Sequence, residues 1–443
     1  MRPHAGLHLA VLVLSFASSL LPAQSPPPIP MGTASASTSS MLATEHHLFV
    51  LRDGVLYQFD VHSLQLLRSH RFDGELTTAK VGEVPAATKP AVAAPALPEA
   101  PTQLQMQASV DGALRWLVDH QDEDGRWDSD GFGKHDPDGK TDGAGSPTHD
   151  VSATGLSVLA LLGGGNTMRA GPHKDAVKRA VAWLRNQQQE NGLFGTNAAH
   201  DFIYDHAIAT YAVCEAYGLS GYVSLKPTAQ KGLDYLESHR NPYAVWRYQP
   251  RDNDNDTSVT TWAVQALESG RFFGLTINKE ALVVAASWYD QVTTPDGRAG
   301  YTKAGERSSR LPAEAAKFPP EKGEAMTAAA TWARYIVQQT PATKPVMQAS
   351  LDVMLGNPPR WEDGHIDAIY WYFGTAAAWQ AGEKHWAEWS RTLRPLVEQQ
   401  RTDGSFAGSW DPIGVWDGMS GRVHVTALYA LTLTTGARRS RIR

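Results

Sequence analysis

The sequence predicts an all-α fold, a closed (α/α)6 toroid of six helical hairpins over residues 103–436, preceded by a small β-hairpin segment. Three observations predict the ring. A half-apolar helical segment recurs along the chain, a wholly apolar segment alternates with it, and similar glycine-containing turns follow several of the half-apolar segments. The chain has 443 residues, of which 42% are hydrophobic, and a chain of this length can bury a large core.

The first recurring segment has an aromatic residue at its fourth place. It reads ALRWLVDHQ (113–121), AVAWLRNQQ (180–188), GLDYLESHR (232–240) and AASWYDQV (285–292). The aromatic residues follow one another at intervals of roughly 50 to 70 residues, which indicates an internal repeat. Apolar residues fall on one helical face and charges on the other, so these segments are predicted to be half-exposed outer helices.

The second segment is small and apolar on nearly every face, which is typical of a buried helix. It occurs at 150–161, 205–216, 256–267, 324–336, 368–380 and 422–433. The count predicts six pairs, spaced by about 54 residues on average. The repeats at the two ends are no more polar than the others, which favours a closed ring over an open superhelix, the alternative architecture.

Turns with a shared pattern follow the outer segments. They carry glutamine, glycine and an aromatic residue at fixed spacing, namely Gln121/Gly125/Trp127, Gln188/Gly192/Phe194 and Gln400/Gly404/Phe406. Glycine permits a left-handed conformation after a helix end, and the glutamine amide can satisfy backbone groups that the helix ends leave unpaired.

These turns resemble the QW repeats of squalene–hopene cyclases and the related toroid of protein prenyltransferases, over roughly residues 103–435. The chain is even more similar to secreted bacterial prenyltransferase/squalene oxidase repeat proteins, a subgroup without an established activity. Stretches such as YDHAIATYAVCEAYG (204–218) and GRVHVTALYALTL (421–433) carry this similarity. The resemblance implies an α/α toroid that binds or transforms an isoprenoid-like or other apolar ligand in a central cavity.

The acid that the cyclase resemblance requires is replaced in this chain. Squalene–hopene cyclases use the middle acid of D-x-D-D-T, and the matching stretch, Asn253 to Thr257, has Asn255 at that place. An amide cannot protonate an alkene, so Asp254 serves only if the register slips by one. Prenyltransferases hold zinc with Asp, Cys and His, and the single cysteine, Cys214, lies in an apolar segment. No cofactor is therefore evident, although a divalent metal is possible.

Polar residues gather where the predicted inner helices begin, at one mouth of the ring. We assign candidate catalytic roles to Asp150, His206, Asp254 and Asp256, and candidate ligand-binding roles to His149, Tyr204, Asp205, Arg422 and His424. Converging carboxylates and histidines can bind a metal or act as acid and base. The alternative is helix capping, for which Asp150, Asp256 and Asp205 are suitably placed.

Aromatic residues on the inner helices are the second set of candidates. Trp262, Tyr370 and Tyr372 are predicted to contact the ligand, together with Tyr211, Trp371 and Phe373. Such rings could hold an isoprenoid, stabilise a cation or stack on a sugar, or they could simply pack. The loop at 128–145 has the composition of a calcium loop without the ligand spacing of an EF-hand, so it is interpreted as a flexible mouth loop.

The N-terminal quarter predicts export and a separate module. Residues 1–23 read as a signal peptide, with an uncleaved anchor as the alternative. Residues 24–45 are predicted to be disordered, 46–75 to form a small β-strand module with a turn at Asp53-Gly54, and 76–102 to be a Pro/Ala-rich linker. A basic tail, 437–443, ends the chain. The expected location is periplasmic or extracellular.

Three functions stay open at this point. A net charge of −6 argues against nucleic acid as a partner. The first hypothesis is an exported toroid that handles an apolar ligand, and the second is a carbohydrate-active (α/α)6 glycosidase or lyase with paired acids. The third is a non-catalytic scaffold that recruits a protein partner through its N-terminal strands. Peripheral contact with a membrane is also possible.

Overall fold

The computed structural model describes residues 40–43, 47–52, 55–60, 66–71, 98–137, 139 and 142–438. The chain divides into two compact units, Met1–Ala94 and Pro95–Arg443. The predicted signal peptide, most of the segment 24–45, most of the linker and the end of the basic tail lie outside the described residues, and so does the turn at Asp53-Gly54.

The backbone of the first unit forms four short antiparallel strands in the order β1-β2-β3-β4. They are β1 (Ser40–Ala43), β2 (His47–Arg52), β3 (Val55–Asp60) and β4 (Leu66–Arg71). In the register, His47 pairs with Asp60 and Arg52 with Val55. Strand β1 falls within the stretch expected to be disordered. The assignment of residues 46–75 as a module of its own stays a prediction.

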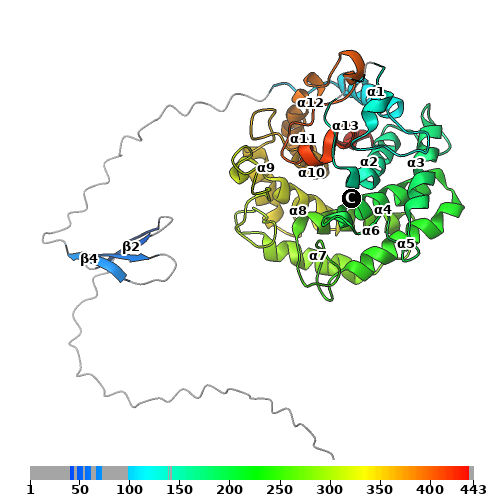
Figure 1. Cartoon of the computed structure of the whole chain (residues 1–443). Helices are drawn as coiled ribbons and strands as arrows, with labels where there is room; N and C mark the ends of the chain where they lie inside the picture. The colour runs from blue at the N-terminus through cyan, green and yellow to red at the C-terminus, as the bar shows by residue number, and fades with distance from the viewer. Residues whose placement is uncertain are drawn as a thin grey trace, which may run out of the picture. The chain divides into compact units, whose positions relative to one another are not determined.

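Six inner helices form a closed ring in the second unit (Figure 1). They are α2 (Asp150–Gly163), α4 (Phe202–Ser220), α6 (Thr257–Phe272), α8 (Ala325–Ile336), α10 (Ala368–Gln380) and α13 (Asp417–Leu433). Each packs against the next along the chain, and α13 packs against α2. This last contact rules out the open superhelix and confirms the (α/α)6 toroid. Helix α13 contains a kink at Gly421, where φ is 76°.

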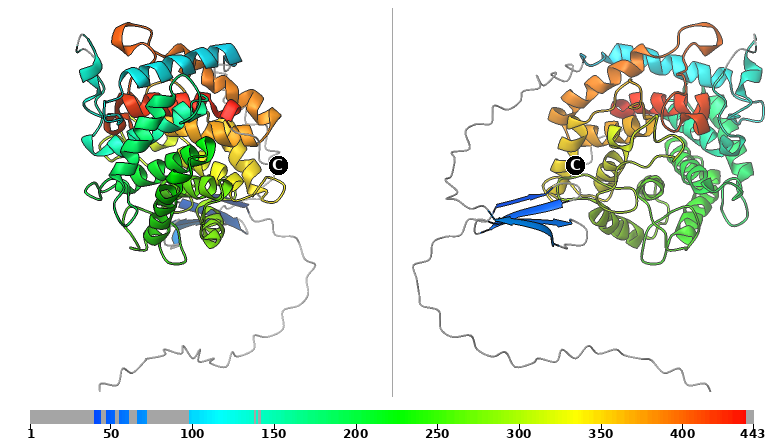
Figure 2. Two further views of the ribbon diagram at one scale, coloured as in Figure 1. Left: turned by 90° about the vertical axis from the view of Figure 1, so that its right-hand side faces the viewer. Right: turned by 60° about the vertical axis from the view of Figure 1, so that its left-hand side comes forward.

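The outer layer surrounds this ring and is seen from the side in Figure 2. Its helices are α1 (Gln103–Asp119), α3 (Lys174–Gln187), α5 (Lys226–His239), α7 (Lys279–Val292) and α9 (Val346–Gly356), followed by the short helices α11 (Glu383–Trp389) and α12 (Arg394–Glu398). Helices α3, α5, α7, α9 and α11 each pack on the inner helix before them in the chain, and α12 packs against α1. Helix α1, at the start of the domain, packs on α13, at its end.

The turns between outer and inner helices fix neighbouring hairpins to each other. The Gln121 amide donates to the carbonyl oxygens of Gly125 (2.8 Å) and of Ala176 in the next outer helix (3.0 Å). Gly125 has a φ of 100°, and a Cβ there would lie 2.4 Å from the backbone of Arg179. Only glycine combines this conformation with so close an approach. Gln188 repeats the arrangement, since its amide donates to Gly192 and Thr228.

The third turn differs from the predicted Gln400/Gly404/Phe406. The Gln400 amide donates to the carbonyl oxygens of Gly408 and Ser109, both at 2.8 Å, so Gly408 takes the place of Gly125. Trp410 then takes the place of Trp127, because its indole N–H donates to a carbonyl of the preceding outer helix, as the Trp127 indole does. The loop between Gln400 and Gly408 is four residues longer than the loop between Gln121 and Gly125. Gly404 was therefore matched to Gly125 by its spacing from the glutamine, although Gly408 holds the equivalent position.

In three of the hairpins, a threonine one turn into the inner helix binds the tryptophan that ends the preceding turn. Thr154, Thr260 and Thr426 accept the backbone N–H of Trp127, Trp246 and Trp410.

Among the helices that the structure describes, none combines the length and apolar character needed to cross a bilayer.

Candidate functional site

The mouth of the ring, where all six inner helices begin, carries a row of acidic residues with little exposure. They are Asp150, Asp205, Asp256, Glu324, Asp367 and Asp417. Burial raises the pKa of Asp150 and of Asp256 to about 6 and that of Asp417 to about 7. Three of the predicted candidates, Asp150, Asp205 and Asp256, thus belong to this row at the starts of α2, α4 and α6.

Asp256 is fully buried at the start of α6 and caps that helix. Its carboxylate accepts the backbone N–H of Val259 at 2.7 Å and the hydroxyls of Ser258 and Tyr301, each at 3.2 Å. Tyr248 bonds the Tyr301 hydroxyl at 2.6 Å. Burial raises the pKa of Asp256 although these donors oppose the rise, so the group can hold a proton near neutral pH.

Tyr204 belongs to the same cluster, because its hydroxyl bonds the hydroxyl of Ser258. Asp254 lies at its edge, because its carboxylate is 68% exposed and meets Arg247 at 3.5 Å, while the same guanidinium lies 3.6 Å from Asp256. Asn255, in the place of the cyclase acid, accepts the backbone N–H of Val245 at 3.0 Å. It therefore holds the turn before α6 together.

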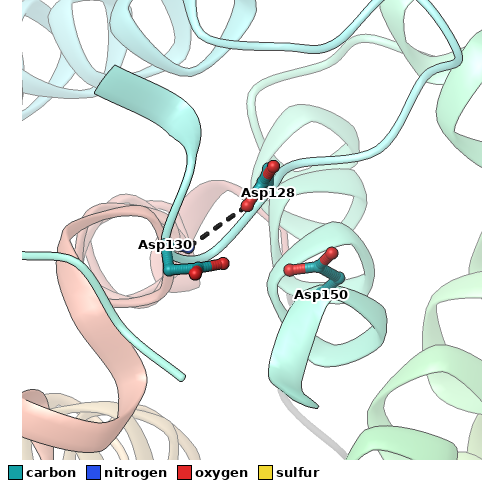
Figure 3. A group of neighbouring side chains, drawn as sticks. All are labelled: Asp128, Asp130 and Asp150. Atoms are coloured by element: carbon teal, nitrogen blue, oxygen red, sulfur yellow. Dashed lines mark hydrogen bonds between the residues drawn. The ribbon is translucent and has the colours of Figure 1, made fainter. Parts of the chain in front are cut away.

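A second acidic group combines Asp150 with two residues of the mouth loop (Figure 3). Asp128, Asp130 and Asp150 each offer a carboxylate oxygen, and these oxygens lie within 4.8 Å of one another. Asp150 accepts the backbone N–H of Ser129 at 2.8 Å. It is the first residue of α2 and receives no capping bond from that helix, so the predicted capping role is not observed.

Cations border this group. The Arg126 guanidinium lies 3.2 Å from Asp150 and 3.4 Å from Asp128, and Lys134 lies 3.0 Å from Asp128. Burial would raise the pKa of Asp128, but the hydrogen bonds of Lys134 and Gly131 lower it to about 2. The three carboxylates are donors that Ca²⁺ accepts. The two cations already compensate their charge, so the donor set fits a metal poorly.

His149 and Asp205 join α2 to α4. Asp205 accepts the backbone N–H of Ser152 and a bond from the His149 ring, both at 3.1 Å, so it caps the neighbouring helix rather than its own. Burial alone would lower the pKa of His149, but the bond and charge of Asp205 raise it. His424 lies nearby on α13, where burial and the charge of His149 lower its pKa to about 3.

His206 lies away from the mouth surface and is fully buried. One ring nitrogen accepts the backbone N–H of Phe194 at 3.0 Å, and the other meets the carbonyl of Gly232 at 3.1 Å. It thus occupies the place of Thr154 in the first hairpin. Burial lowers its pKa to about 3, and with both nitrogens engaged it is a packing residue.

Arg422 is likewise engaged in the scaffold. Its buried guanidinium bonds Asp142 at 2.5 Å and Asp411 at 2.7 Å, and so ties the mouth loop to the turn before α13. The loop at 128–145, interpreted from sequence as flexible, is anchored at this point.

The predicted aromatic lining fills the interior instead. Six rings are at most 3% exposed, namely Tyr211, Trp262, Tyr370, Trp371, Tyr372 and Phe373. Trp262 stacks on Tyr372 at 5.4 Å. Tyr372 bonds Gln265, and Tyr370 bonds the carbonyl of Asn357. These rings are therefore part of the packed interior and show almost no surface to a ligand.

Sequence reasoning missed Asp128, Asp130 and the tyrosines at 248 and 301. Asp128 and Asp130 stand in the loop that was compared only with an EF-hand. Their Asp-x-Asp spacing directly after Trp127 was a usable signal. Tyr248 and Tyr301 follow the turns by only a few residues. Only the folded ring brings them to Asp256.

Comparisons with known proteins point to one fold, which is shared by proteins of different activities. The family model described as squalene-hopene cyclase C-terminal domain matches residues 92–201. No curated protein matches the sequence. An apo structure of the type II terpene cyclase MstE from Scytonema is 16% identical, with 76% of this chain and 99% of that chain covered and a TM-score of 0.50.

Two carbohydrate-active proteins are equally similar in structure. An unsaturated glucuronyl hydrolase specific for heparin is 13% identical, with 76% and 98% of the chains covered and a TM-score of 0.53. An α-1,6-mannanase of Salegentibacter sp. HEL1_6 is 8% identical, with 75% and 99% covered and a TM-score of 0.51. At these identities the likeness shows the fold alone, so the choice of chemistry rests on the side chains.

Proposed function

We propose that this squalene-cyclase-like α/α toroid is a carbohydrate-active enzyme that cleaves glycosidic bonds at its mouth, with Asp150 as the acid and Asp128 as its ionised partner. One observation carries the proposal. The two carboxylates have oxygens within 4.8 Å of each other, and their pKa values lie on opposite sides of the ordinary aspartate value. Such a pair divides the roles of acid and base.

The chemistry follows from this division. Protonated Asp150 donates its proton to the leaving glycosidic oxygen, while ionised Asp128 attacks the anomeric carbon. Water then releases the sugar with Asp150 acting as base. A separation near ~5 Å is typical of glycosidases that retain anomeric configuration. Arg126, between the two acids, orients both and limits their repulsion.

The packing of the interior favours a polar substrate over an apolar one. The aromatic residues expected to hold an isoprenoid are at most 3% exposed. At the mouth, by contrast, His149, Tyr204, Tyr248 and Tyr301 are partly exposed, and each is polar or carries a hydroxyl. Sugar hydroxyls can bond to each of them.

The test is hydrolysis by the purified full chain. The panel contains α-1,6-mannan, unsaturated glucuronyl oligosaccharides, cellulose, xylan and starch, and new reducing ends are measured for the wild type and for Asp150→Asn and Asp128→Asn. We expect activity on at least one substrate and a loss of about 10²-fold or more in each variant. The product should first form with retained configuration, which proton NMR detects.

The matched control is Asp124→Asn, a change in the turn before this loop, at a carboxylate that is 54% exposed. It should keep wild-type activity. Absence of hydrolysis across the panel, or full activity in Asp150→Asn, contradicts the proposal.

A second function is favoured by Asp256. It is a buried acid with a raised pKa at the start of α6, next in sequence to the position where cyclases carry their acid, and it supports the apolar-ligand hypothesis. Lipid extraction of the purified protein with mass spectrometry, and binding of geranylgeraniol, test it. Absence of bound lipid and of geranylgeraniol binding removes this function.

A further inference from the structure

A cavity of 570 Å³ opens beside α1, at the outer rim of the mouth. Its walls come from three segments: the second half of α1, the residues at 135–137 and the turn at 400–408. Arg115, Asp119, His120, Asp136 and Arg401 supply its charged and ionisable side chains, with His135 beside them. This volume lies within the range of small-molecule sites, roughly 300 to 1,000 Å³.

The cavity has a built polar wall. One His120 nitrogen bonds the carbonyl oxygen of Trp116 at 2.7 Å, and the other bonds Asp136 at 2.9 Å. A carbonyl only accepts, so that nitrogen carries a proton. The second contact then needs a proton of its own, held between His120 and Asp136. The His–Asp pair is therefore fixed in orientation before any ligand arrives.

Asp136 has one oxygen to spare. The residue is 8% exposed, and within the described part of the chain its Oδ2 atom is buried without a hydrogen-bond partner. A buried acceptor of this kind is costly unless a donor reaches it. The atom is closed off from solvent, so a ligand hydroxyl reaches it only when the adjacent cavity wall shifts.

Two further groups of the cavity carry no ion pair among the described residues. Arg115 and Asp119 lie one turn apart on α1 and both are exposed. Arg401, by contrast, is held by Asp403 and Asp411 at 2.7 and 2.9 Å. The cavity thus offers the guanidinium of Arg115 and the exposed carboxylate of Asp119, both without an ion pair among the described residues.

We propose that this cavity is an accessory subsite for a neutral saccharide of one or two sugar units. Each sugar hydroxyl donates and accepts, so a vicinal pair can accept from Arg115 while it donates to Asp119. The mixed charges disfavour a ligand with a strong charge of one sign. The ligand class rests on the proposed function, whereas the location of the site does not.

The subsite is linked to the acid pair through Asp122. His135, in the cavity wall, bonds one oxygen of Asp122 at 2.7 Å. Lys134 bonds the other oxygen at 2.7 Å and reaches Asp128 at 3.0 Å. A saccharide bound in the cavity therefore lies against the loop that carries Asp128, the ionised partner of Asp150.

The experiment measures sugar binding by the full chain with isothermal titration and saturation-transfer NMR. The probes are the methyl glycosides of glucose, galactose, mannose and N-acetylglucosamine, with cellobiose and α-1,6-mannobiose. We expect at least one probe to bind, and its Kd to rise roughly tenfold in Arg115→Ala and in Asp119→Ala, since each loses a charge-assisted hydrogen bond. Both residues are exposed, so both variants should fold.

Arg185→Ala is the matched control, an exposed arginine in the last turn of α3, and it should bind as the wild type does. Asp150→Asn and Asp128→Asn should also keep cavity binding while they lose hydrolysis, which separates the two proposals. Binding of no probe, or binding that Arg115→Ala leaves unchanged, overturns the subsite. So does preferential binding of glycine or diglycine, which would indicate a zwitterionic ligand.

Discussion

Replacing Asp256 by asparagine should stabilise the protein at high pH. The carboxyl is fully buried, and burial raises its pKa from an ordinary 3.8 to about 6. The folded state therefore binds this proton more tightly than the unfolded state does. The cost of the buried charge is small below pH 4, grows as the pH rises, and is complete above about pH 6.

The magnitude follows from the pKa difference. Two pKa units correspond to roughly 3 kcal/mol at pH 8, an upper value for a buried group. Asparagine is an equally good N-cap. Its amide oxygen can keep the bonds from Val259 and Ser258, and its NH2 group can donate to the hydroxyl of Tyr301 instead of accepting from it. Asp256→Asn should thus be more stable than the wild type by roughly 2 to 3 kcal/mol at pH 8 and by much less at pH 4.

Urea unfolding followed by tryptophan fluorescence, at several pH values between 4 and 8, measures this difference. Asp254→Asn, at a neighbouring carboxylate that is 68% exposed, is the control and should change little at any pH. A variant that is less stable than the wild type at pH 8, or a difference that does not grow with pH, would refute the reasoning.

Three further predictions concern the turns and the acid. Gly192→Ala should destabilise the fold by roughly 2 kcal/mol or more in urea unfolding, because φ is 96° and a Cβ would lie 2.2 Å from the carbonyl of Lys231. His206→Thr should be more stable than His206→Val, by about 1–3 kcal/mol in the same assay, since only threonine can accept the N–H of Phe194. Hydrolysis should decline as the pH rises through about 6, where Asp150 loses its proton, and the pH profile of kcat/KM measures this.

Each has a matched comparison. Gly165→Ala changes a glycine with a φ of 82° and nothing within 4 Å of the added carbon, so it shows the conformational cost alone and should be milder than Gly192→Ala. Equal stability of the two His206 variants would mean that the bond to Phe194 contributes nothing. A pH profile that stays flat between 5 and 8 would exclude Asp150 as the acid.

The fold could be predicted because the alternation of half-apolar and wholly apolar segments directly reflects two layers of helices. The details of the mouth could not. His206 reads as a polar candidate in the sequence, and only the hairpin geometry shows that it replaces Thr154. Asp205 reads as a cap for its own helix but serves Ser152 of the neighbouring one. The contact between Asp205 and Ser152 joins residues 53 positions apart, and the role of His206 depends on how its hairpin folds, so local patterns encode neither.

The sequence also could not show whether the aromatic residues line a cavity or fill the interior. Tyr370 and Trp262 lie on helices that predict burial equally well around a hollow ring or a filled one. Whether the centre is open depends on side-chain packing between α6 and α10, where Trp262 stacks on Tyr372. Periodicity carries no information on that point.

The contact between α1 and α13 has a consequence for how the chain folds as it is made. Helix α1 leaves the ribosome before the rest of the ring, but its partner is among the last segments synthesised. Arg394, near the end, also supplies the bonds that hold the backbone of Glu99 and Ala100. The apolar face of α1 therefore waits for some three hundred residues, and a loop of this length makes closure slow. A nascent chain halted before α13 is thus an open arc with an uncovered apolar face at each end. Such faces are expected to bind chaperones or a second copy of the chain.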